Sequence, residues 1–151
     1  MELYTTAMRR EDIDQILAIE DASFPSPWGR EAFESELENP NARNIVIKEK
    51  RADGAGRVVG YVCFWFVVDE IHIRNIAVSL ECRMRGIGTK LLRHVFSEGC
   101  QKQLKAAVLE TRPSNQPAIS FYKKFGFKVV GRRPGYYSET GEDALIMSRK
   151  L

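Results

Sequence analysis

The 151-residue sequence lacks the long apolar stretch that a membrane-spanning helix requires. Such a helix needs about 20 consecutive apolar residues, whereas the longest apolar run, residues 58–68, contains Gly60 and ends before Asp69. The first residues carry no basic segment followed by an apolar core, so they predict no secretion signal. We therefore expect a cytoplasmic protein that does not bind a membrane.

Cysteine is scarce, and its spacing argues against two kinds of site. Cys63, Cys82 and Cys100 are odd in number and include no CxxC pair. Evenly paired cysteines are typical of disulfide frameworks, and closely spaced pairs are typical of structural zinc sites. The three cysteines therefore predict neither of these sites, and we expect reduced thiols and no bound metal.

A large excess of charge of one sign is also lacking. The 23 lysines and arginines and 20 acidic residues give a net charge of +3, too small to predict the concentrated basic face of a nucleic-acid-binding protein. A small anionic ligand suits this balance equally well. The sequence contains no repeats, low-complexity tracts or linkers, so we predict one domain, residues 1–151.

The apolar residues that are present follow regular patterns. Helical spacing predicts four helices, and strand-like runs bounded by turn residues predict seven strands. We expect helices over residues 11–24, 30–37, 86–102 and 115–125, and strands over residues 3–7, 44–50, 57–68, 70–78, 106–110, 128–133 and 144–148. This order of elements predicts a mixed α/β (α+β) fold with a central, largely antiparallel sheet and one βαβ unit.

The strand predicted over residues 70–78 leads directly into a glycine-containing loop. Side chains alternate between the two faces of a strand, so one face is expected to carry Ile71, Ile73, Asn75 and Ala77. His72 falls on the other face. A lone histidine is usually a packing or surface residue, and we expect no catalytic role for it.

The loop after this strand has the pattern of an anion site. Arg83-x-x-Gly86-x-Gly88 opens a predicted helix, where unpaired backbone N–H groups and the helix dipole favour negative charge. Glycines let a diphosphate approach the main chain, and Arg83 and Arg85 can add charge-assisted hydrogen bonds. The alternative is a tight strand-to-helix turn without a ligand. The P-loop and dinucleotide-binding patterns both fit this loop poorly.

Further residues follow the loop at characteristic spacings. They are Glu110 at a strand end, Asn115, Ala118 and Tyr122 in the next predicted helix, and Gly126-Phe127 after it. Together with Ile76-Ala77-Val78 and the glycine loop, they resemble the GNAT acetyltransferase superfamily. Within it, residues 75–78, 109–115 and 136–147 resemble the ribosomal-protein alanine N-acetyltransferases, the RimI type. The resemblance covers nearly the whole chain.

The resemblance implies acetyl-CoA as co-substrate, held in a V-shaped slot where a helix-flanked sheet is splayed. Pantetheine would lie along the backbone of residues 76–78, and the pyrophosphate would lie on the glycine loop. The implied cofactor-binding residues are Ile76, Ala77, Val78, Arg83, Met84, Arg85, Gly86, Ile87, Gly88, Thr89 and Asn115. Residues 79–82 and Arg83 depart from the family pattern, but neither departure removes a backbone N–H donor.

The chemistry requires a neutral amine, because only its free electron pair can attack a thioester. A free α-amine, with a pKa near ~8, loses its proton more easily than a lysine, with a pKa near ~10.4. The resemblance makes Glu110 the base, acting directly or through water, and Tyr122 the acid that protonates the departing thiolate. The alternatives are a surface glutamate at a strand end and a core or ligand-stacking aromatic. We also expect Asn115 to cap its helix.

Aromatic residues in two predicted loops bear on the acceptor. Trp28 follows Phe-Pro-Ser-Pro, and Tyr136 and Tyr137 follow Gly135; in the N-terminal acetyltransferases that this chain resembles, these loops flank the peptide groove. We therefore expect a protein or peptide N-terminus as acceptor, such as the N-terminal alanine of a small-subunit ribosomal protein. Anchoring of the loops to the core is the alternative. A small-molecule amine acetyltransferase and a non-catalytic acetyl-CoA-binding regulatory module stay open as other functions.

Overall fold

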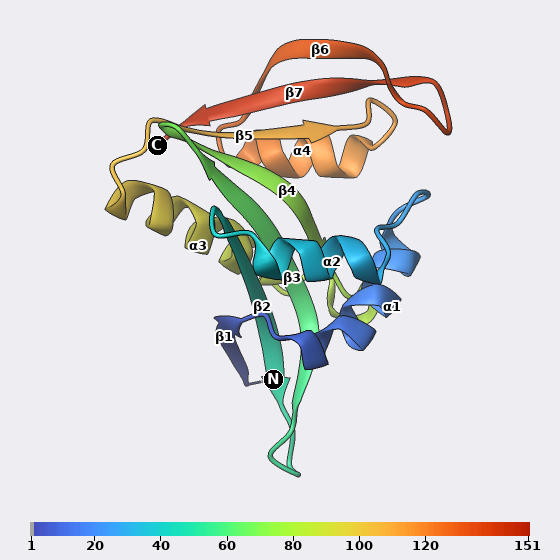
Figure 1. The fold of residues 1–151 in the computed structure, drawn as a ribbon, viewed down its shortest axis with the longest axis vertical. Helices are drawn as coiled ribbons and strands as arrows, with labels where there is room; N and C mark the ends of the chain where they lie inside the picture. The colour runs from blue at the N-terminus through green and yellow to red at the C-terminus, as the bar shows by residue number, and fades with distance from the viewer. Residues whose placement is uncertain (1) are drawn as a thin grey trace.

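A seven-stranded sheet with the strand order β1-β2-β3-β4-β5-β7-β6 dominates the structure, a computed structural model that describes residues 2–151 (Figure 1). Its strands are β1 (Leu3–Ala7), β2 (Ala42–Lys50), β3 (Gly56–Val67), β4 (Glu70–Val78), β5 (Ala106–Thr111), β6 (Lys128–Tyr137) and β7 (Glu142–Lys150). The helices are α1 (Ile13–Ser23), α2 (Arg30–Glu38), α3 (Ile87–Gln101) and α4 (Gln116–Lys124), with short 3₁₀ helices η1 (Arg10–Asp12) and η2 (Leu80–Cys82). The predicted mixed α/β fold is confirmed.

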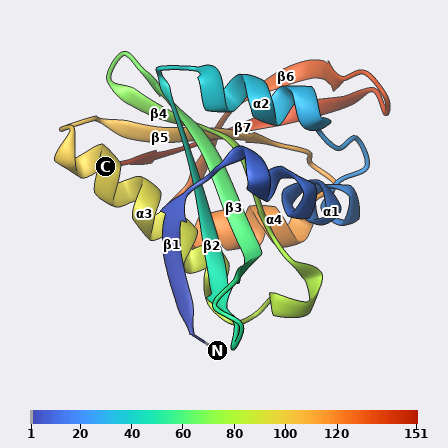
Figure 2. The same cartoon turned by 60° about the horizontal axis from the view of Figure 1, so that its bottom comes forward.

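The helices cover the two faces of the sheet in pairs (Figure 2). On one face α1 and α2 enclose a small core that includes Ile16, Phe33, Tyr61 and Cys63. On the other face α3 and α4 enclose a larger core that includes Phe64, Leu91, Leu92, Tyr122 and Phe127. Burial of these apolar faces is the main favourable contribution to folding, at roughly 25 cal/mol per Å² of apolar surface.

The sheet divides between β4 and β5, which run parallel whereas the other neighbouring pairs run antiparallel. Their pairing extends from Glu70 opposite Ala106 to Ile73 opposite Leu109. Beyond these residues β4 continues against β3, and β5 continues against β7. The two strands therefore separate toward their carboxyl ends, which confirms the expected V-shaped slot.

A β-bulge at Arg74 changes the direction of side chains along β4. Cys63 of β3 pairs with Asn75 and Phe64 pairs with Ile73, so Arg74 is an extra residue in the ladder. Ile73 consequently packs in the α3–α4 core, whereas Asn75 points toward α1. The expectation of one shared face for residues 71, 73, 75 and 77 is wrong, because a bulge shifts the alternation by one residue.

The predicted elements match those observed to within a few residues, except at β6. This strand continues to Tyr137 after a second irregularity in its register against β7, so Tyr136 and Tyr137 belong to a strand rather than to the expected loop. The positive φ of Gly135, +60°, accommodates the irregularity. Within residues 2–151, no helix has both the length and the apolar character needed to cross a membrane.

Candidate active site

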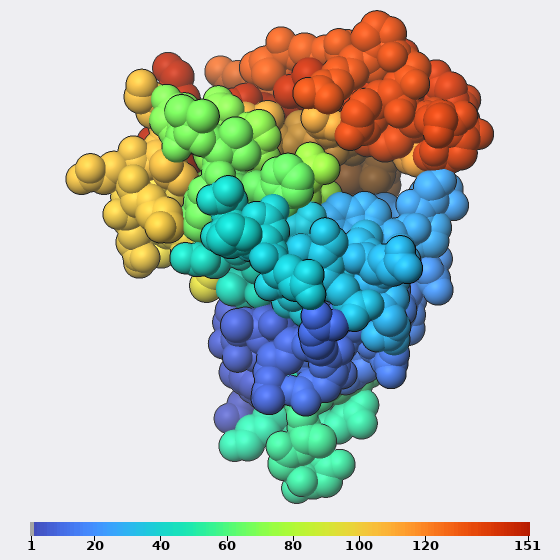
Figure 3. All heavy atoms as spheres, viewed as in Figure 1, coloured from blue at the N-terminus to red at the C-terminus, as the bar shows by residue number. Residues whose placement is uncertain are grey.

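Two adjoining pockets, each of about 340 Å³, open where β4 and β5 separate. Trp28, Glu110 and Tyr137 line both pockets. The first pocket, here called the α4 pocket, extends to Tyr122, and the second, the β6 pocket, extends to Tyr136. Figure 3 shows a recess in this region, between the blue segment that joins α1 to α2 and the orange-red β6–β7 hairpin. The separation of two strands thus brings the predicted acid, base and acceptor residues to one place.

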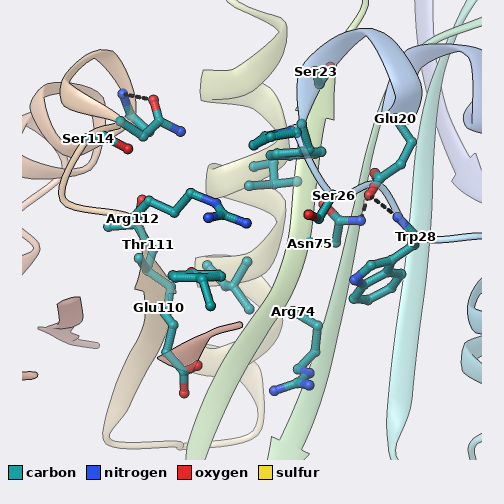
Figure 4. A pocket seen from close by; sticks show the side chains of 18 of the residues that line it. Glu20, Ser23, Ser26, Trp28, Arg74, Asn75, Glu110, Thr111, Arg112 and Ser114 are labelled. Carbon is teal, nitrogen blue, oxygen red and sulfur yellow. Dashed lines mark hydrogen bonds between the residues drawn. The ribbon is translucent and has the colours of Figure 1, made fainter. Parts of the chain in front are cut away.

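Glu110 lies where the two pockets meet. It is the fifth residue of β5, beyond the last pairing with β4, and its side chain is 22% exposed (Figure 4). Its carboxylate is 3.7 Å from the guanidinium of Arg133. The pKa of Tyr136 is raised by partial burial and by a hydrogen bond to this carboxylate. Glu110 is therefore a partly exposed carboxylate that can reach a ligand in either pocket.

Tyr122 projects from α4 into the α4 pocket and is 9% exposed. Its ring also contacts Phe121 and Phe127, at centroid distances of 5.6 and 5.7 Å. Burial, with a smaller contribution from Tyr137, raises the pKa of the Tyr122 phenol well above its usual value. The residue is thus both part of the core and a pocket residue, and it retains its proton throughout the neutral range.

The start of α3 is open, as an anion site requires. Gly86 precedes the helix with φ +79°, in the left-handed region that disfavours other residues. A Cβ built there would meet no atom within 4 Å, and across residues 2–151 no side chain caps this helix start. The first N–H groups of α3, at Ile87, Gly88 and Thr89, precede the first helical bond, from Lys90 to Gly86. They are the donors that a diphosphate would use.

Packing between helices gives a second reason for a glycine at position 88, besides the expected approach of a diphosphate. A Cβ at this position would lie 3.1 Å from Cζ of Phe121 on α4. The missing side chain therefore lets α3 and α4 approach each other. Gly88 can offer a ligand only its backbone N–H. Ile87 is similarly a core residue, with 1% of its surface exposed, and can offer a ligand only its backbone.

The side chains of the glycine loop differ in their surroundings: Arg83 bonds to other elements, whereas those of Met84 and Arg85 are exposed. The Arg83 guanidinium donates to the Val78 carbonyl and to the Ser23 hydroxyl, each at 3.2 Å, and so ties the loop to β4 and α1. Met84 has φ +66° and a fully exposed side chain, and Arg85 is also exposed. The loop is thus held in shape by Arg83, while the space beside Gly86 stays open.

The remaining predicted cofactor residues line the slot in two ways. Ile76 lines the α4 pocket directly, whereas Ala77 packs toward α1 and Val78 packs against the α3–α4 core. Past Ile73 the edge of β4 is no longer paired with β5, which leaves backbone groups on that edge for a ligand. Asn115 lines the same pocket, and its Oδ1 accepts from Ala118 N–H at 3.3 Å, so the predicted helix cap is confirmed.

This combination fits acetyl-CoA, which needs donors for a diphosphate and an extended edge for the pantetheine amides. Gly86 and the first turn of α3 supply the donors, and the unpaired edge of β4 supplies the strand. Both lie on the side of the slot that leads to Tyr122. When bound, acetyl-CoA would supply the activated acetyl group.

The predicted acceptor residues meet across the opening. Trp28 packs on Phe33 with ring centroids 5.3 Å apart and also lines both pockets. It therefore anchors its loop to the core and also forms part of the pocket wall. Tyr136 and Tyr137 contact each other edge to face at 5.0 Å. Burial raises the pKa of Tyr137 to about 12. These three aromatic residues form the sides of the β6 pocket.

Arg112 is a pocket residue that the sequence patterns did not assign. It lies two residues after Glu110 on the segment that follows β5, and its guanidinium stacks 3.9 Å from the ring centre of Tyr137. It donates to Thr140 at 3.1 Å, pairs closely with Glu139 and lies 3.6 Å from Glu142. Arg112 thus holds the β6–β7 turn over the slot. An arginine two residues after a strand-end carboxylate was the available signal.

Glu20 is a second residue without a predicted role. It is 1% exposed, lines the α4 pocket, and accepts hydrogen bonds from Tyr61, Asn75 and the backbone of Trp28. The available signal was its position on the apolar face of α1, because an acid at a core position requires partners.

Comparisons with known proteins agree with this geometry. Residues 13–127 match the model of the acetyltransferase (GNAT) family. A Bacillus subtilis protein provisionally named a ribosomal protein bS18-alanine N-acetyltransferase is 43% identical over 141 residues, which cover 93% of this chain and 90% of the relative. An N-alpha-acetyltransferase of Sulfurisphaera tokodaii is 35% identical over 158 residues, covering 95% and 90%.

A solved structure of an acetyltransferase has a similar fold. The crystal structure of the ribosomal-protein-S18-alanine N-acetyltransferase from Escherichia coli superimposes with a TM-score of 0.86 at 26% identity, covering 99% of this chain and 94% of that one. The seven-stranded, splayed sheet is therefore shared with an enzyme of known fold. The chain belongs to the GNAT acetyltransferase family, and acetyl-CoA is its acetyl donor.

Proposed function

We propose that this acetyltransferase modifies the α-amine of a protein N-terminus, by direct attack of the amine on the thioester. One observation carries the proposal: two pockets of different character meet at the Glu110 carboxylate. The α4 pocket adjoins the β4 edge and Tyr122, and the β6 pocket is walled by aromatic residues. A chain end in the β6 pocket would place its amine beside Glu110.

In this proposal Glu110 and Tyr122 divide the proton transfers. Glu110 accepts the proton of the incoming ammonium at a carboxylate oxygen, directly or through water, and the neutral amine then attacks. As the C–N bond forms and the C–S bond breaks, Tyr122 donates its phenolic proton to the departing sulfur, and the second proton lost by the nitrogen passes through solvent to restore the phenol. The support for this role is the position of Tyr122 in the α4 pocket; the raised pKa keeps the phenol protonated at the pH of turnover but also makes it a weaker acid.

The entrance supports a chain end as acceptor. Glu139, held by Arg112 at the β6–β7 turn, also accepts from the hydroxyl of Ser26 in the α1–α2 loop, and these hydrogen bonds lower the pKa of Glu139. The two loops therefore meet beside the β6 pocket. A narrow entrance favours an unbranched chain end, whose α-amine is also closer to neutral at pH 7 than a lysine.

The relatives suggest a finer acceptor. The proteins from B. subtilis and E. coli carry the name ribosomal protein bS18-alanine N-acetyltransferase. We propose that this chain likewise acts on the N-terminal alanine of a small-subunit ribosomal protein, and does so in the cytoplasm, where that substrate is made. The name of the S. tokodaii relative, N-alpha-acetyltransferase, supports the α-amine as the group modified.

The proposal is tested with purified protein, acetyl-CoA and a set of peptides that differ in their first residue. We expect efficient acetylation of peptides that begin with alanine and weaker acetylation of peptides with bulky first residues. An N-terminally blocked peptide with an internal lysine and the polyamine spermidine serve as controls. A higher kcat/KM for either control than for the alanine peptide would reject the N-terminal acceptor while leaving the acetyltransferase assignment intact.

A further inference from the structure

The buried Glu20 carboxylate joins three elements that frame the slot. Its Oε1 accepts from Asn75 Nδ2 at 2.8 Å, and its Oε2 accepts from the Trp28 backbone N–H at 3.0 Å (Figure 4). Oε1 also accepts from the Tyr61 hydroxyl. Tyr61 belongs to β3, Asn75 directly follows the bulge in β4, and Trp28 ends the loop after α1. One side chain therefore links the cofactor strand to the loop that walls both pockets.

A carboxylate in this position is costly unless its partners are complete. Removing an ionised group from water costs several kcal/mol or more, and charge-assisted hydrogen bonds offset that cost. The Tyr61 hydroxyl has burial as the main cause of its raised pKa and Glu20 as the next, so the phenol is held as a donor. The bulge at Arg74 supplies the third partner, because it turns Asn75 toward α1.

We propose that Glu20 is a positioning residue for the acceptor: it fixes the Trp28 loop against the bulged part of β4 and so sets the width of the acceptor entrance. The inference rests on the proposed function only in taking a peptide as the acceptor. Glu20 acts through Trp28, which lines the β6 pocket, whereas Glu20 itself lines only the α4 pocket. The backbone donors at the start of α3 are not among the hydrogen-bond partners of Glu20, so we expect the peptide to be affected more than acetyl-CoA.

A second buried carboxylate provides a matched control. Glu36 of α2 is 8% exposed and accepts from Trp65 Nε1 at 2.6 Å through Oε2. It is not among the described residues that line either pocket. A glutamine at position 36 keeps one side-chain oxygen, which is enough to accept the bond from Trp65. A glutamine at position 20 also keeps only one oxygen, but the donors to Glu20 use both of its oxygens. Glu20→Gln should therefore disturb its network, and Glu36→Gln should leave its own bond intact.

The first measurement is steady-state kinetics of wild type, Glu20→Gln and Glu36→Gln with an alanine-initiated peptide. For Glu20→Gln we expect the peptide KM to rise about tenfold, the effect of one unsatisfied buried donor, with the acetyl-CoA KM within twofold of wild type. Glu36→Gln should change neither constant by more than twofold. Equal rises in both KM values for Glu20→Gln would overturn the inference.

The second measurement needs no acceptor. The chain has two tryptophans, so a Trp65→Phe background leaves Trp28 as the single tryptophan, which can be excited at wavelengths that tyrosine does not absorb. In that background Glu20→Gln should raise acrylamide quenching of Trp28, because the released loop exposes the indole. Tyr61→Phe keeps the bond from Trp28 to the carboxylate and should lower Tm without changing the quenching.

The outcomes separate this inference from the proposed function. If the wild-type protein acetylates no peptide, the proposed function is wrong, and the quenching measurement still tests whether Glu20 fixes the Trp28 loop. Should Glu20→Gln not fold, Glu20→Asp keeps the charge but withdraws the carboxylate by one methylene group, and it should also raise the quenching. A variant at position 20 with lowered Tm but unchanged Trp28 quenching would show that Glu20 only stabilises the fold, and the inference would be wrong.

Discussion

The two sides of the slot offer a ligand different kinds of contact, main-chain groups on one side and side chains on the other. On the cofactor side, the candidate contacts are main-chain groups: the first N–H groups of α3 and the unpaired edge of β4. On the acceptor side they are side chains, chiefly Trp28, Tyr136 and Tyr137, held by Arg112 and Glu20. A site made of backbone groups depends on the local backbone conformation. A site made of side chains depends on the neighbouring residues that hold those side chains in place. Substitutions on the two sides should therefore fail in different ways, one in acetyl-CoA affinity and the other in peptide affinity.

Glu110, where the two sides meet, should show the largest effect. Glu110→Gln removes the proton acceptor but keeps the shape of the side chain, so kcat should fall by about 10³-fold, within the range for a general base. The loss should be greatest at low pH, where more of the amine is protonated. Stopped-time assays from pH 6 to 9, with calorimetry showing unchanged acetyl-CoA affinity, check this. A wild-type rate in the variant would remove Glu110 from the chemistry.

Tyr122 should show the next largest effect. Tyr122→Phe keeps the buried ring and deletes only the phenolic proton, so we expect kcat to fall about 10²-fold with Tm little changed. Because burial raises the pKa of Tyr122, the phenol stays protonated through pH 9 and wild-type activity should not decline there through its ionisation. If Tyr122→Phe lowers Tm but not kcat, the ring has only a packing role.

On the cofactor side, Gly86 provides a test with a matched control. Gly86→Val places a β-branched residue at φ +79°, which costs roughly 1–2 kcal/mol or forces the loop to change. We expect acetyl-CoA affinity to fall about tenfold, measured by calorimetry. Gly54→Val at φ +84°, also with no atom within 4 Å, introduces the same strain in the distant β2–β3 turn and should leave the affinity unchanged. Equal Kd values in both variants would contradict the anion-site assignment.

On the acceptor side, Tyr137 should show the smallest effect of the four. Tyr137→Ala removes one wall of the β6 pocket and the partner on which Arg112 stacks. An aromatic contact contributes about 1 kcal/mol, so the peptide KM should rise about fivefold while the acetyl-CoA KM stays within twofold. Tyr4→Ala, at an exposed tyrosine of β1, is the control. A larger change in the acetyl-CoA KM would mean that the two sides are not separable.

The sequence indicates more of the local structure on the cofactor side than on the acceptor side. Gly86, the loop around it and the Asn115 cap are local features, because a left-handed conformation and a helix start depend on adjacent residues. Gly88 shows the limit of that logic. Its pattern was interpreted as room for a diphosphate, but the close neighbour is Phe121, 33 residues later in the chain. A local pattern cannot distinguish a ligand from a packed helix.

The sequence pointed to Trp28, Tyr136 and Tyr137 on the acceptor side, but only the tertiary structure showed what supports them. No spacing in the sequence indicates that Arg74 is a bulge, that Asn75 therefore turns toward α1, or that Glu20 accepts from three elements at once. The extension of β6 through Tyr137 and its attachment by Arg112 likewise depend on contacts across the sheet.

The sequence by itself determined the fold class, the order of the elements and the glycine loop, since hydrophobic periodicity and backbone preferences act over a few residues. Only the tertiary structure decided which side chains share the slot. The separation of β4 from β5 and the bulge are set by pairing between segments far apart in the chain. Such pairing depends on the packing of whole faces, which no short motif encodes.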